Sequence, residues 1–248
     1  MTRVLIVTGG GRGIGAAIAR EAGREGFKVC VNYSRAQNEA EAIAAELRSQ
    51  GNDAIALQAD VSDEEEVEAM FRNVEESFGP VTALVNNAGI LHQRPVADMT
   101  LDDFNRTMAV NLQGAFLCAR AAVRRMSTKS GGSGGVVVNI SSISARTGGG
   151  SGGVVYAASK GALDSFTIGL AKEVAQEGIR VCAVRPGITE TEIFNDGPGL
   201  EEVKSKVGDM VPMGRIGQPA EIAALAVWLC SPAASYVTGS LFDVSGGR

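Results

Sequence analysis

The sequence predicts an α/β fold in which one doubly wound domain is built on a seven-stranded parallel sheet with helices on both faces. Three observations predict it. Strand-like and helix-like segments alternate from end to end, the strands are nearly continuous apolar runs, and a glycine-rich loop follows the first strand. The 248 residues, 45% of them hydrophobic, are enough for one large core, so we expect residues 1–248 to form a single domain of the Rossmann type.

In the first half of the chain, apolar runs predict strands at residues 4–7, 29–33 and 54–59. Apolar side chains at helical spacing predict a helix that begins at Ile14 and further helices at 39–49 and 63–78. The Ser-Asp-Glu-Glu run that begins at Ser62 is a capping signal for the last of these helices. Each helix separates two strands, as the crossovers of a parallel sheet require.

The second half continues the alternation. The same criteria predict strands at residues 81–86, 136–141, 179–185 and 241–244, and helices at 101–126, 156–176 and 219–230. The Gly/Ser-rich stretch 130–135 is interpreted as an exposed turn and not as a linker, because the strand after it belongs to the same alternation.

Composition and charge exclude several classes of protein. The net charge is −5 and the Lys and Arg residues are scattered, which argues against a nucleic-acid partner. The four cysteines form no CxxC pair and the chain has one histidine, His92, so we expect no metal site and interpret the cysteines as buried, reduced thiols. No leader-like apolar stretch opens the chain, and its longest apolar run, 222–230, is about half of a membrane span of about 20 residues, so we expect a cytoplasmic protein without a membrane partner.

The glycine loop is the first candidate binding site. Gly9, Gly13 and Gly15 have the spacing GxxxGxG between the first strand and the first helix. Glycines allow a tight turn and a close approach to a pyrophosphate, whose charge then meets the free N–H groups of the helix. A glycine turn with a purely structural role is the alternative. The candidate cofactor contacts in this loop are Gly9, Gly11, Arg12, Gly13, Ile14 and Gly15.

The end of the second strand favours NADP(H) over NAD(H), with NAD(H) as the alternative. Sites that prefer NAD usually place an acid here for the ribose 2′-hydroxyl, and this segment has none before Glu39. Arg35 and Arg12 could instead hold a 2′-phosphate between two guanidinium groups, although Arg35 could equally be a solvated surface residue. The candidate contacts at this strand end are Asn32, Tyr33, Ser34 and Arg35.

Two further strand ends contribute candidates. Asp60 and Val61 follow the third strand, where the carboxylate could accept from an adenine amino group or cap the next helix. Asn87, Ala88 and Gly89 follow the fourth strand, where small and amide side chains can pack against a cofactor ribose. Both lie at the carboxyl edge of the sheet, where ligands of doubly wound folds bind.

The most informative pair is Tyr156 and Lys160, which lie four residues apart on a predicted helix and therefore on one face. We expect the ammonium group to lower the pKa of the phenol toward neutrality, which would suit Tyr156 to proton transfer with a carbonyl or alcohol oxygen. A helix-surface pair is the alternative. Ser142, 14 residues earlier at a strand end, could bond the same substrate oxygen.

The glycine loop, the Asn-Asn-Ala-Gly segment, the strand-end serine and the Tyr-x-x-x-Lys pair together resemble, in order and spacing, the short-chain dehydrogenase/reductase family. The resemblance covers essentially the whole chain. It implies a catalytic tetrad of Asn111, Ser142, Tyr156 and Lys160, with Tyr156 as general acid/base, Ser142 orienting the carbonyl, Lys160 also bonding the nicotinamide ribose, and Asn111 holding a water for proton relay. The cofactor carries the hydride.

The resemblance also implies cofactor contacts from Pro186, Gly187, Ile188 and Thr191, from Tyr156 and Lys160, and a homotetramer that uses the helices 101–126 and 156–176 and the strand near Leu241. The interval from Ser142 to Tyr156 is about one residue longer than is usual in the family and is rich in glycine, which leaves Ser141 and Ser144 as rival serines. Residues 189–215 are expected to form a lid over the substrate.

The substrate is expected to be a small carbonyl compound or secondary alcohol. Within the family the chain resembles most the glucose-1-dehydrogenase-like branch, which implies a sugar or polyol, and the 3-oxoacyl-[acyl-carrier-protein] reductase-like branch, which is the alternative. A sensor or scaffold that binds NADP without turnover is a lesser alternative, because Tyr156 and Lys160 are both present.

Overall fold

The computed structural model describes residues 3–150, 152–193, 199–205 and 207–248. All seven strands pair in parallel in one sheet of order β3-β2-β1-β4-β5-β6-β7. The strand order reverses between β1 and β4, so a crevice for ligands is expected at the carboxyl ends of these two strands. The strands are β1 (Val4–Val7), β2 (Lys28–Tyr33), β3 (Ala54–Gln58), β4 (Ala83–Asn86), β5 (Gly135–Ile140), β6 (Ile179–Pro186) and β7 (Leu241–Val244).

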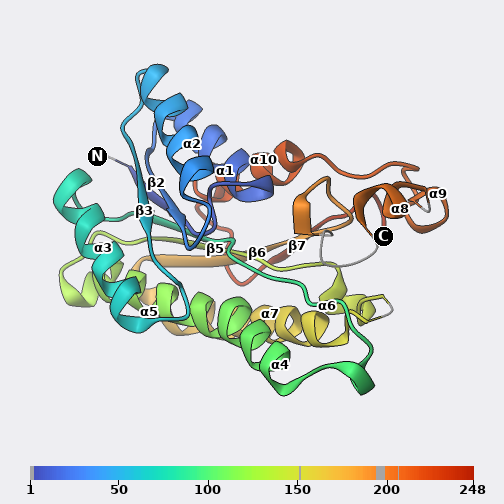
Figure 1. The fold of residues 1–248 in the computed structure, drawn as a ribbon. Helices are drawn as coiled ribbons and strands as arrows, with labels where there is room; N and C mark the ends of the chain where they lie inside the picture. Colours follow the sequence, from blue (N-terminus) through green and yellow to red (C-terminus); the bar gives the residue numbers. More distant parts are fainter. Residues whose placement is uncertain (1–2, 151, 194–198, 206) are drawn as a thin grey trace.

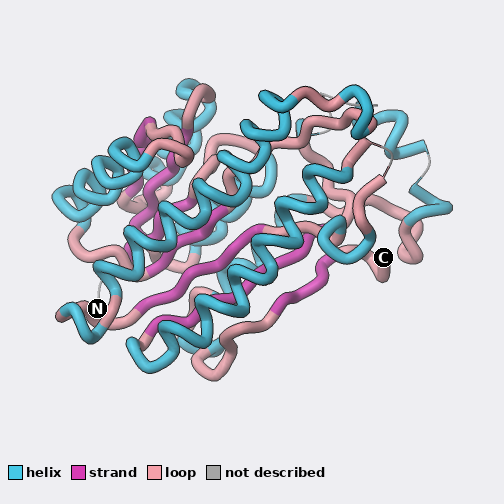
Figure 2. The backbone as a smooth tube through the Cα atoms, turned by 90° about the horizontal axis from the view of Figure 1, so that it is seen from below, coloured by secondary structure: helices cyan, strands magenta, loops and turns pink. Residues whose placement is uncertain are grey.

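Helices cover both faces of the sheet, as the sequence predicts (Figure 1). One face is covered by α1 (Gly13–Arg24), α2 (Gln37–Ser49) and α10 (Pro219–Leu229), and the other by α3 (Glu64–Phe78), α5 (Gly114–Met126) and α7 (Val154–Val174). Figure 2 shows the long helices of the second layer lying along the strands.

The core consists of two apolar layers, because successive strand residues point to opposite faces of the sheet. In β1, Leu5 and Val7 pack in the cluster that includes α1, α2 and α10 residues, whereas Val4 and Ile6 pack in the cluster that includes α3, α5 and α7 residues. Both clusters end at the same carboxyl edge of the sheet, where the predicted site residues lie.

Most predicted strands and helices agree with the structure to within two residues at each end. The start of α3 differs: the N-cap is Asp63, whose side chain accepts from the Glu66 backbone N–H, and not Ser62. The four cysteines are buried, as predicted, and none of them forms a disulfide. None of the described helices is long and apolar enough to cross a membrane, and within the described ranges no group of three or more His, Cys, Asp or Glu could hold a metal ion.

The predicted helix 101–126 is not one regular helix. It consists of α4 (Leu101–Met108), a π-helical segment (Ala109–Gln113) and α5, which follow one another without a break. Such segments are rare and occur frequently at functional sites. Hydrophobic periodicity could not reveal this one, because both flanks remain helical.

Short helices that the sequence did not predict lie at the carboxyl edge of the sheet. They are α6 (Ser144–Thr147), α8 (Gly199–Ser205) and α9 (Val207–Met210). The last two lie within the predicted lid 189–215, of which residues 194–198 and 206 are outside the described residues. Within this segment Val211 packs with Ile188 and Ile216 in a small separate apolar cluster. Short one-turn helices complete the fold at Val96–Asp98, Thr128–Ser130, Ala175–Glu177 and Pro232–Ala234.

Candidate active site

The glycine loop after β1 is built from glycines for specific steric reasons. Gly9 and Gly13 have φ values of +61° and +51°, in the region that favours glycine. A Cβ atom on Gly15 would lie 2.3 Å from the Gly9 carbonyl oxygen and 2.5 Å from Nδ2 of Asn87, so no side chain fits there. The loop is therefore folded tightly against the end of β4.

The first turn of α1 suits an anion. Its N-cap residue, Arg12, makes no side-chain capping bond, and the first turn contains no acidic residue. The first N–H groups of a helix lack partners within the helix and carry the positive end of its dipole. The residues present therefore fit the pyrophosphate of a dinucleotide at this loop.

A hydroxyl that the sequence analysis did not select organises the loop. Thr8 is 1% exposed, and its Oγ1 accepts from the backbone N–H groups of Asn87, at 2.9 Å, and Ala88, at 3.0 Å. The Asn87 side chain bonds to the same segment in the opposite direction, since its Nδ2 donates to the carbonyl oxygens of Thr8 and Gly9. A polar residue at the end of a strand that is otherwise buried is the signal that could have identified Thr8.

The end of β2 exposes two of the candidate cofactor contacts. Ser34 and Arg35 are exposed, and Arg35 has no hydrogen bond or ion pair with the described residues. The Asn32 side chain is buried and accepts from the Gly9 N–H at 3.3 Å while donating to backbone carbonyls of the neighbouring β3 segment. Tyr33 is also buried. Asn32 therefore supports the glycine loop through its side chain.

Arg12 lies beside the start of the predicted lid. Its guanidinium group forms a 2.8 Å ion pair with Glu192, and both side chains are more than half exposed. A Cβ on Gly13 would lie 3.1 Å from Cγ2 of Thr191, so the segment after β6 rests directly on the glycine loop.

Other residues of this segment are fixed at its base. The Pro186 carbonyl accepts from the Ile143 N–H at 3.0 Å, and Gly187 has no room for a side chain against Ser245. Ile188 is buried in the apolar cluster below the lid.

Asp60 is already engaged by protein groups. Its Oδ1 accepts from the Ser62 N–H at 3.0 Å and from the Ser62 hydroxyl at 2.6 Å, and its Oδ2 pairs with Arg106 at 2.9 Å. Burial alone would raise the pKa of Asp60, but these partners lower it overall. The alternative that Asp60 caps the next helix is wrong, because Asp63 is the cap. Val61 is buried against Gly114.

The predicted catalytic side chains converge at the carboxyl end of β5. Lys160 is 3% exposed, and its Nζ donates to the Ile140 carbonyl at 2.8 Å and lies 5.7 Å from the centroid of the Tyr156 ring. Tyr156 is half-buried and makes a side-chain hydrogen bond with Ser142. The helix-surface alternative for the Tyr156–Lys160 pair is therefore wrong.

The expected effect of Lys160 on the phenol is not found. Burial raises the pKa of Tyr156, and the hydrogen bond with Ser142 is what opposes this rise. The reason is geometric, since the Lys160 ammonium group is directed at the Ile140 carbonyl and lies over the tyrosine ring. Burial also lowers the pKa of Lys160 itself to about 8, against an opposing effect of Asp164. The Tyr156 phenol is therefore protonated at neutral pH.

Asn111 lies in the π-helical segment, buried beneath the loop that follows β4. Its Oδ1 accepts from the Ile90 N–H at 2.8 Å, and its Nδ2 donates to the Ile90 carbonyl and to the Ser159 hydroxyl, both at 3.0 Å. A Cβ on Gly89 would lie 3.4 Å from both Asn111 Oδ1 and Lys160 Nζ. Because Gly89 has no side chain, the Asn111 amide and the Lys160 ammonium group both border the space beside it.

The three candidate serines have different surroundings. Ser141 donates to the Lys160 backbone carbonyl at 3.2 Å, and the Ser144 N–H donates to the Ser142 hydroxyl at 3.1 Å. Ser142 is therefore the serine whose side chain meets Tyr156. The long interval before Tyr156 holds α6 and a glycine loop, in which a Cβ on Gly152 would lie 2.9 Å from the Arg94 nitrogen.

The chain matches a family model described as enoyl-(acyl carrier protein) reductase over residues 9–248. It is 48% identical over 249 residues to the uncharacterized oxidoreductase YgfF of Escherichia coli, with 99% of each chain covered. It is 36% identical over 247 residues to the 3-oxoacyl-[acyl-carrier-protein] reductase FabG of Staphylococcus aureus, covering 100% of this chain and 98% of that protein. A solved short chain dehydrogenase from Burkholderia cenocepacia, in complex with NADP, has a TM-score of 0.89 and 35% identity, with 99% of this chain and 97% of that chain covered.

The fold, the glycine loop and the relatives together show that the protein is an NAD(P)-dependent oxidoreductase. The lengths covered show that the similarity includes the whole sheet and α7. The chain belongs to the short-chain dehydrogenase/reductase family, which confirms the resemblance that the sequence motifs indicate.

Proposed function

We propose that the whole chain, residues 1–248, works as one NADP(H)-dependent catalytic domain that interconverts a carbonyl compound and a secondary alcohol. One observation carries the proposal: the side chains of Ser142, Tyr156 and Lys160 meet at the end of β5, with Asn111 adjoining the same space beside Gly89. NADP(H), when bound, supplies or accepts the hydride.

In this proposal Tyr156 is the general acid. Its raised pKa keeps the phenol protonated at neutral pH, so it can donate to a carbonyl oxygen in the reducing direction. The Ser142 hydroxyl orients that oxygen. Lys160 and Asn111 provide the path by which the proton is replaced. Asn111 donates to the hydroxyl of Ser159 in α7, and this hydroxyl donates to the Tyr156 backbone carbonyl.

The experiment that tests this role is Tyr156→Phe, measured by NADPH oxidation and by NADPH fluorescence titration. We expect turnover to fall by at least about a hundredfold, the usual contribution of a general acid, while the dissociation constant of NADPH stays close to that of the wild type. Turnover by Tyr156→Phe at the wild-type rate would refute the role. A wild-type chain that binds NADPH but reduces no carbonyl would support the sensor or scaffold alternative.

The cofactor preference rests on Arg35, with its neighbour Ser34 and with Arg12 of the glycine loop as the second cation. Two exposed guanidinium groups and no acid at the end of β2 suit a 2′-phosphate, and the Burkholderia cenocepacia relative binds NADP. In Arg35→Asp we expect the Michaelis constant for NADPH to rise and that for NADH not to rise. Equal effects on both cofactors would show that Arg35 does not meet the 2′-phosphate.

Two substrate classes compete. The sequence favours a sugar or polyol, and the similarity to the FabG reductase of Staphylococcus aureus favours a 3-oxoacyl thioester. A panel of aldoses, small ketones and 3-oxoacyl thioesters at equal concentration, followed by NADPH oxidation or NADP reduction, separates them. We expect one class to give a kcat/KM at least tenfold above the others.

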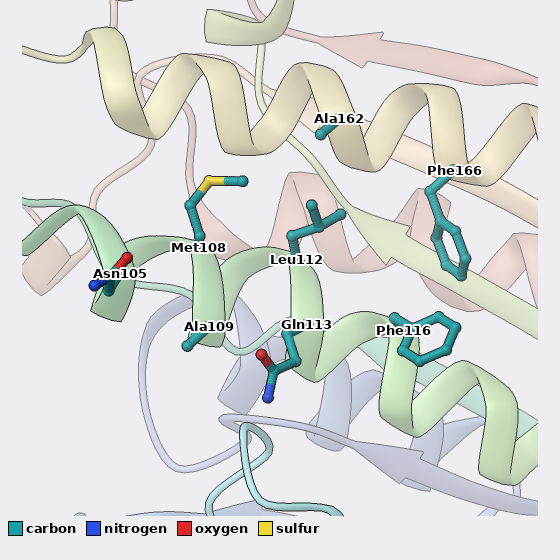
Figure 3. A pocket seen from close by; sticks show the side chains of 8 residues that line it. All are labelled: Asn105, Met108, Ala109, Leu112, Gln113, Phe116, Ala162 and Phe166. Carbon is teal, nitrogen blue, oxygen red and sulfur yellow. The ribbon is translucent and has the colours of Figure 1, made fainter.

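We also propose that the chain forms a homotetramer that uses an apolar groove between the α4–α5 region and α7 (Figure 3). Met108 and Leu112 point into the groove, and the Phe116 and Phe166 rings meet at its end with centroids 6.2 Å apart. Phe116 remains 43% exposed, which leaves apolar surface for a second copy to cover. Phe116→Asp should shift gel filtration from a tetramer to a smaller species, and a wild-type monomer at micromolar concentration would refute the assembly.

A further inference from the structure

A buried ion pair lies one helical turn beyond Lys160. Arg185, near the carboxyl end of β6, donates from Nε at 2.8 Å and from Nη2 at 2.7 Å to the same carboxylate oxygen, Oδ2, of Asp164. The two side chains are only 15% and 9% exposed. The other oxygen, Oδ1 of Asp164, is buried and has no hydrogen-bond partner among the described residues.

Asp164 belongs to the same helix as the catalytic pair. Tyr156, Lys160 and Asp164 follow at intervals of four residues in α7, which places them along one face. Lys160 itself meets the Ile140 carbonyl, the Tyr156 ring and the space beside Gly89 and Asn111. Among the described residues, the charge that acts on the Lys160 ammonium group is that of Asp164, and Tyr156 is the other titratable group beside it.

Stability alone is a weak reason for this arrangement. Removing two charges from water has a large free-energy cost, and the mutual attraction of a buried pair offsets this cost only when the geometry is good and the remaining polar atoms are hydrogen-bonded. Here Oδ1 is left without a partner. The orphaned oxygen therefore calls for a reason other than stability.

Arg185 is in turn held from its other side. Its Nη1 lies 3.4 Å from Oδ1 of Asp243 in β7, and Oδ2 of Asp243 pairs with Arg146 of α6. Arg185 therefore has two carboxylates to hold its orientation, and Asp164 is fixed against β6 by a planar, bidentate donor.

We propose that Asp164 is a positioning residue for the reaction: its carboxylate, fixed by Arg185, holds the Lys160 side chain in the charged form that the catalytic site uses. The inference rests on the proposed function, in which Lys160 takes part in replacing the proton that Tyr156 donates. Burial works against this charge, since it lowers the pKa of Lys160, and Asp164 opposes the lowering. Without the carboxylate, Lys160 would lose its proton closer to neutral pH.

The test is a direct titration of Lys160. The whole chain is labelled with ¹³C at lysine Cε, the Lys160 signal is assigned from its loss in Lys160→Arg, and its shift is followed with pH in the wild type and in Asp164→Asn. We expect a midpoint near 8 in the wild type and a midpoint about one pH unit lower in Asp164→Asn, at the low end of the effect of a nearby opposite charge. The matched control is Glu173→Gln, which removes an exposed carboxylate from the same helix and should leave the midpoint unchanged.

Asp164→Asn leaves Arg185 with less counter-charge and could prevent folding. The double variant Asp164→Asn/Arg185→Gln removes both charges and retains an amide pair, and we expect a smaller fall of the Lys160 midpoint there because the Arg185 charge is lost as well. An unchanged Lys160 midpoint in whichever variant folds would overturn the inference, and so would an equal shift in Glu173→Gln. The alkaline limb of kcat/KM should move with the NMR midpoint, whereas a purely structural role would lower turnover at all pH values alike.

Lys160→Met distinguishes a failure of the proposed function from a failure of the inference about Asp164. If Lys160→Met turns over substrate at the wild-type rate, the proposed function is wrong and Asp164 has no catalytic cation to hold. If Lys160→Met is inactive but the Lys160 midpoint does not respond to Asp164→Asn, the proposed function stands and only the role of Asp164 is wrong.

Discussion

Replacing Thr8 with valine should remove the junction between β1, β4 and the glycine loop while leaving the shape of the side chain nearly unchanged. The Thr8 hydroxyl accepts two backbone N–H groups, from Asn87 at 2.9 Å and from Ala88 at 3.0 Å. Valine leaves both without an acceptor. An unsatisfied buried donor costs about 1–3 kcal/mol, and because both N–H groups are only partly buried, we expect a total loss of about 2–4 kcal/mol in the free energy of unfolding.

Thr8→Ser is the matched control, because it keeps the hydroxyl and deletes one buried methyl group. The loss expected from that methyl group is about 1 kcal/mol. The difference between the two variants therefore isolates the hydrogen bonds from the packing.

The assay is urea-induced unfolding followed by far-UV circular dichroism, together with NADPH titration of the folded variants. Thr8→Val should be the less stable variant and should bind NADPH more weakly, since Asn87 also ties to the Gly9 carbonyl. Equal stability of the two variants, or a more stable valine variant, would contradict the assignment of the hydroxyl as the link between these strands.

Three further predictions concern the cofactor loop, a helix cap and the buried lysine. Gly15→Ala should lower the free energy of unfolding by about 1–3 kcal/mol, as overpacking does, because its Cβ would lie 2.3 Å from the Gly9 oxygen. It should also weaken NADPH binding in fluorescence titration. Binding of NADPH as tight as in the wild type would argue against the close packing of Gly15 on the loop. Asp63→Ala should cost about 1 kcal/mol in urea unfolding, and Asp63→Asn much less, since an amide oxygen can still accept from Glu66. Burial lowers the pKa of Lys160 from 10.5 to about 8, so the unfolded chain binds the additional proton between these values and the wild type gains stability as pH rises through them. Below pH 8 the melting temperature of Lys160→Met should therefore exceed that of the wild type by the largest amount, and this excess should disappear toward pH 10.5. A difference in melting temperature that stays constant with pH would refute the burial of a charged lysine.

The fold could be predicted from the sequence because its determinants are local and repetitive. The apolar strands at Val4–Val7 and Leu241–Val244 have the bounds that the apolar runs predict. The π-helical segment was not predictable, since its five residues lie between regular helices on both sides and are too few to show a separate period. The short helix α6 was missed because its four residues offer too few positions for a periodic pattern.

The site could be located but not resolved from the sequence. Motif spacing brought Ser142, Tyr156 and Lys160 together, since all lie at one edge of the sheet. The direction of the tyrosine pKa was predicted wrongly, because it depends on burial and on where the ammonium group points, which spacing does not contain. Thr8 and the pair of Asp164 with Arg185 could not be identified because their partners are far away in the sequence.

The five-residue π-helical segment at Ala109–Gln113 makes this helix unusually sensitive to changes in chain length. A π turn accommodates one residue more than an α turn, so deleting a single residue there would let the backbone relax into a regular helix. The deletion would also rotate everything before it relative to α5, and would carry Asn111 away from Ile90 and Ser159. A deletion that makes the helix more regular would thus impair the enzyme. Single-residue deletions in this segment should therefore be tolerated far better in screens for folding than in screens for activity.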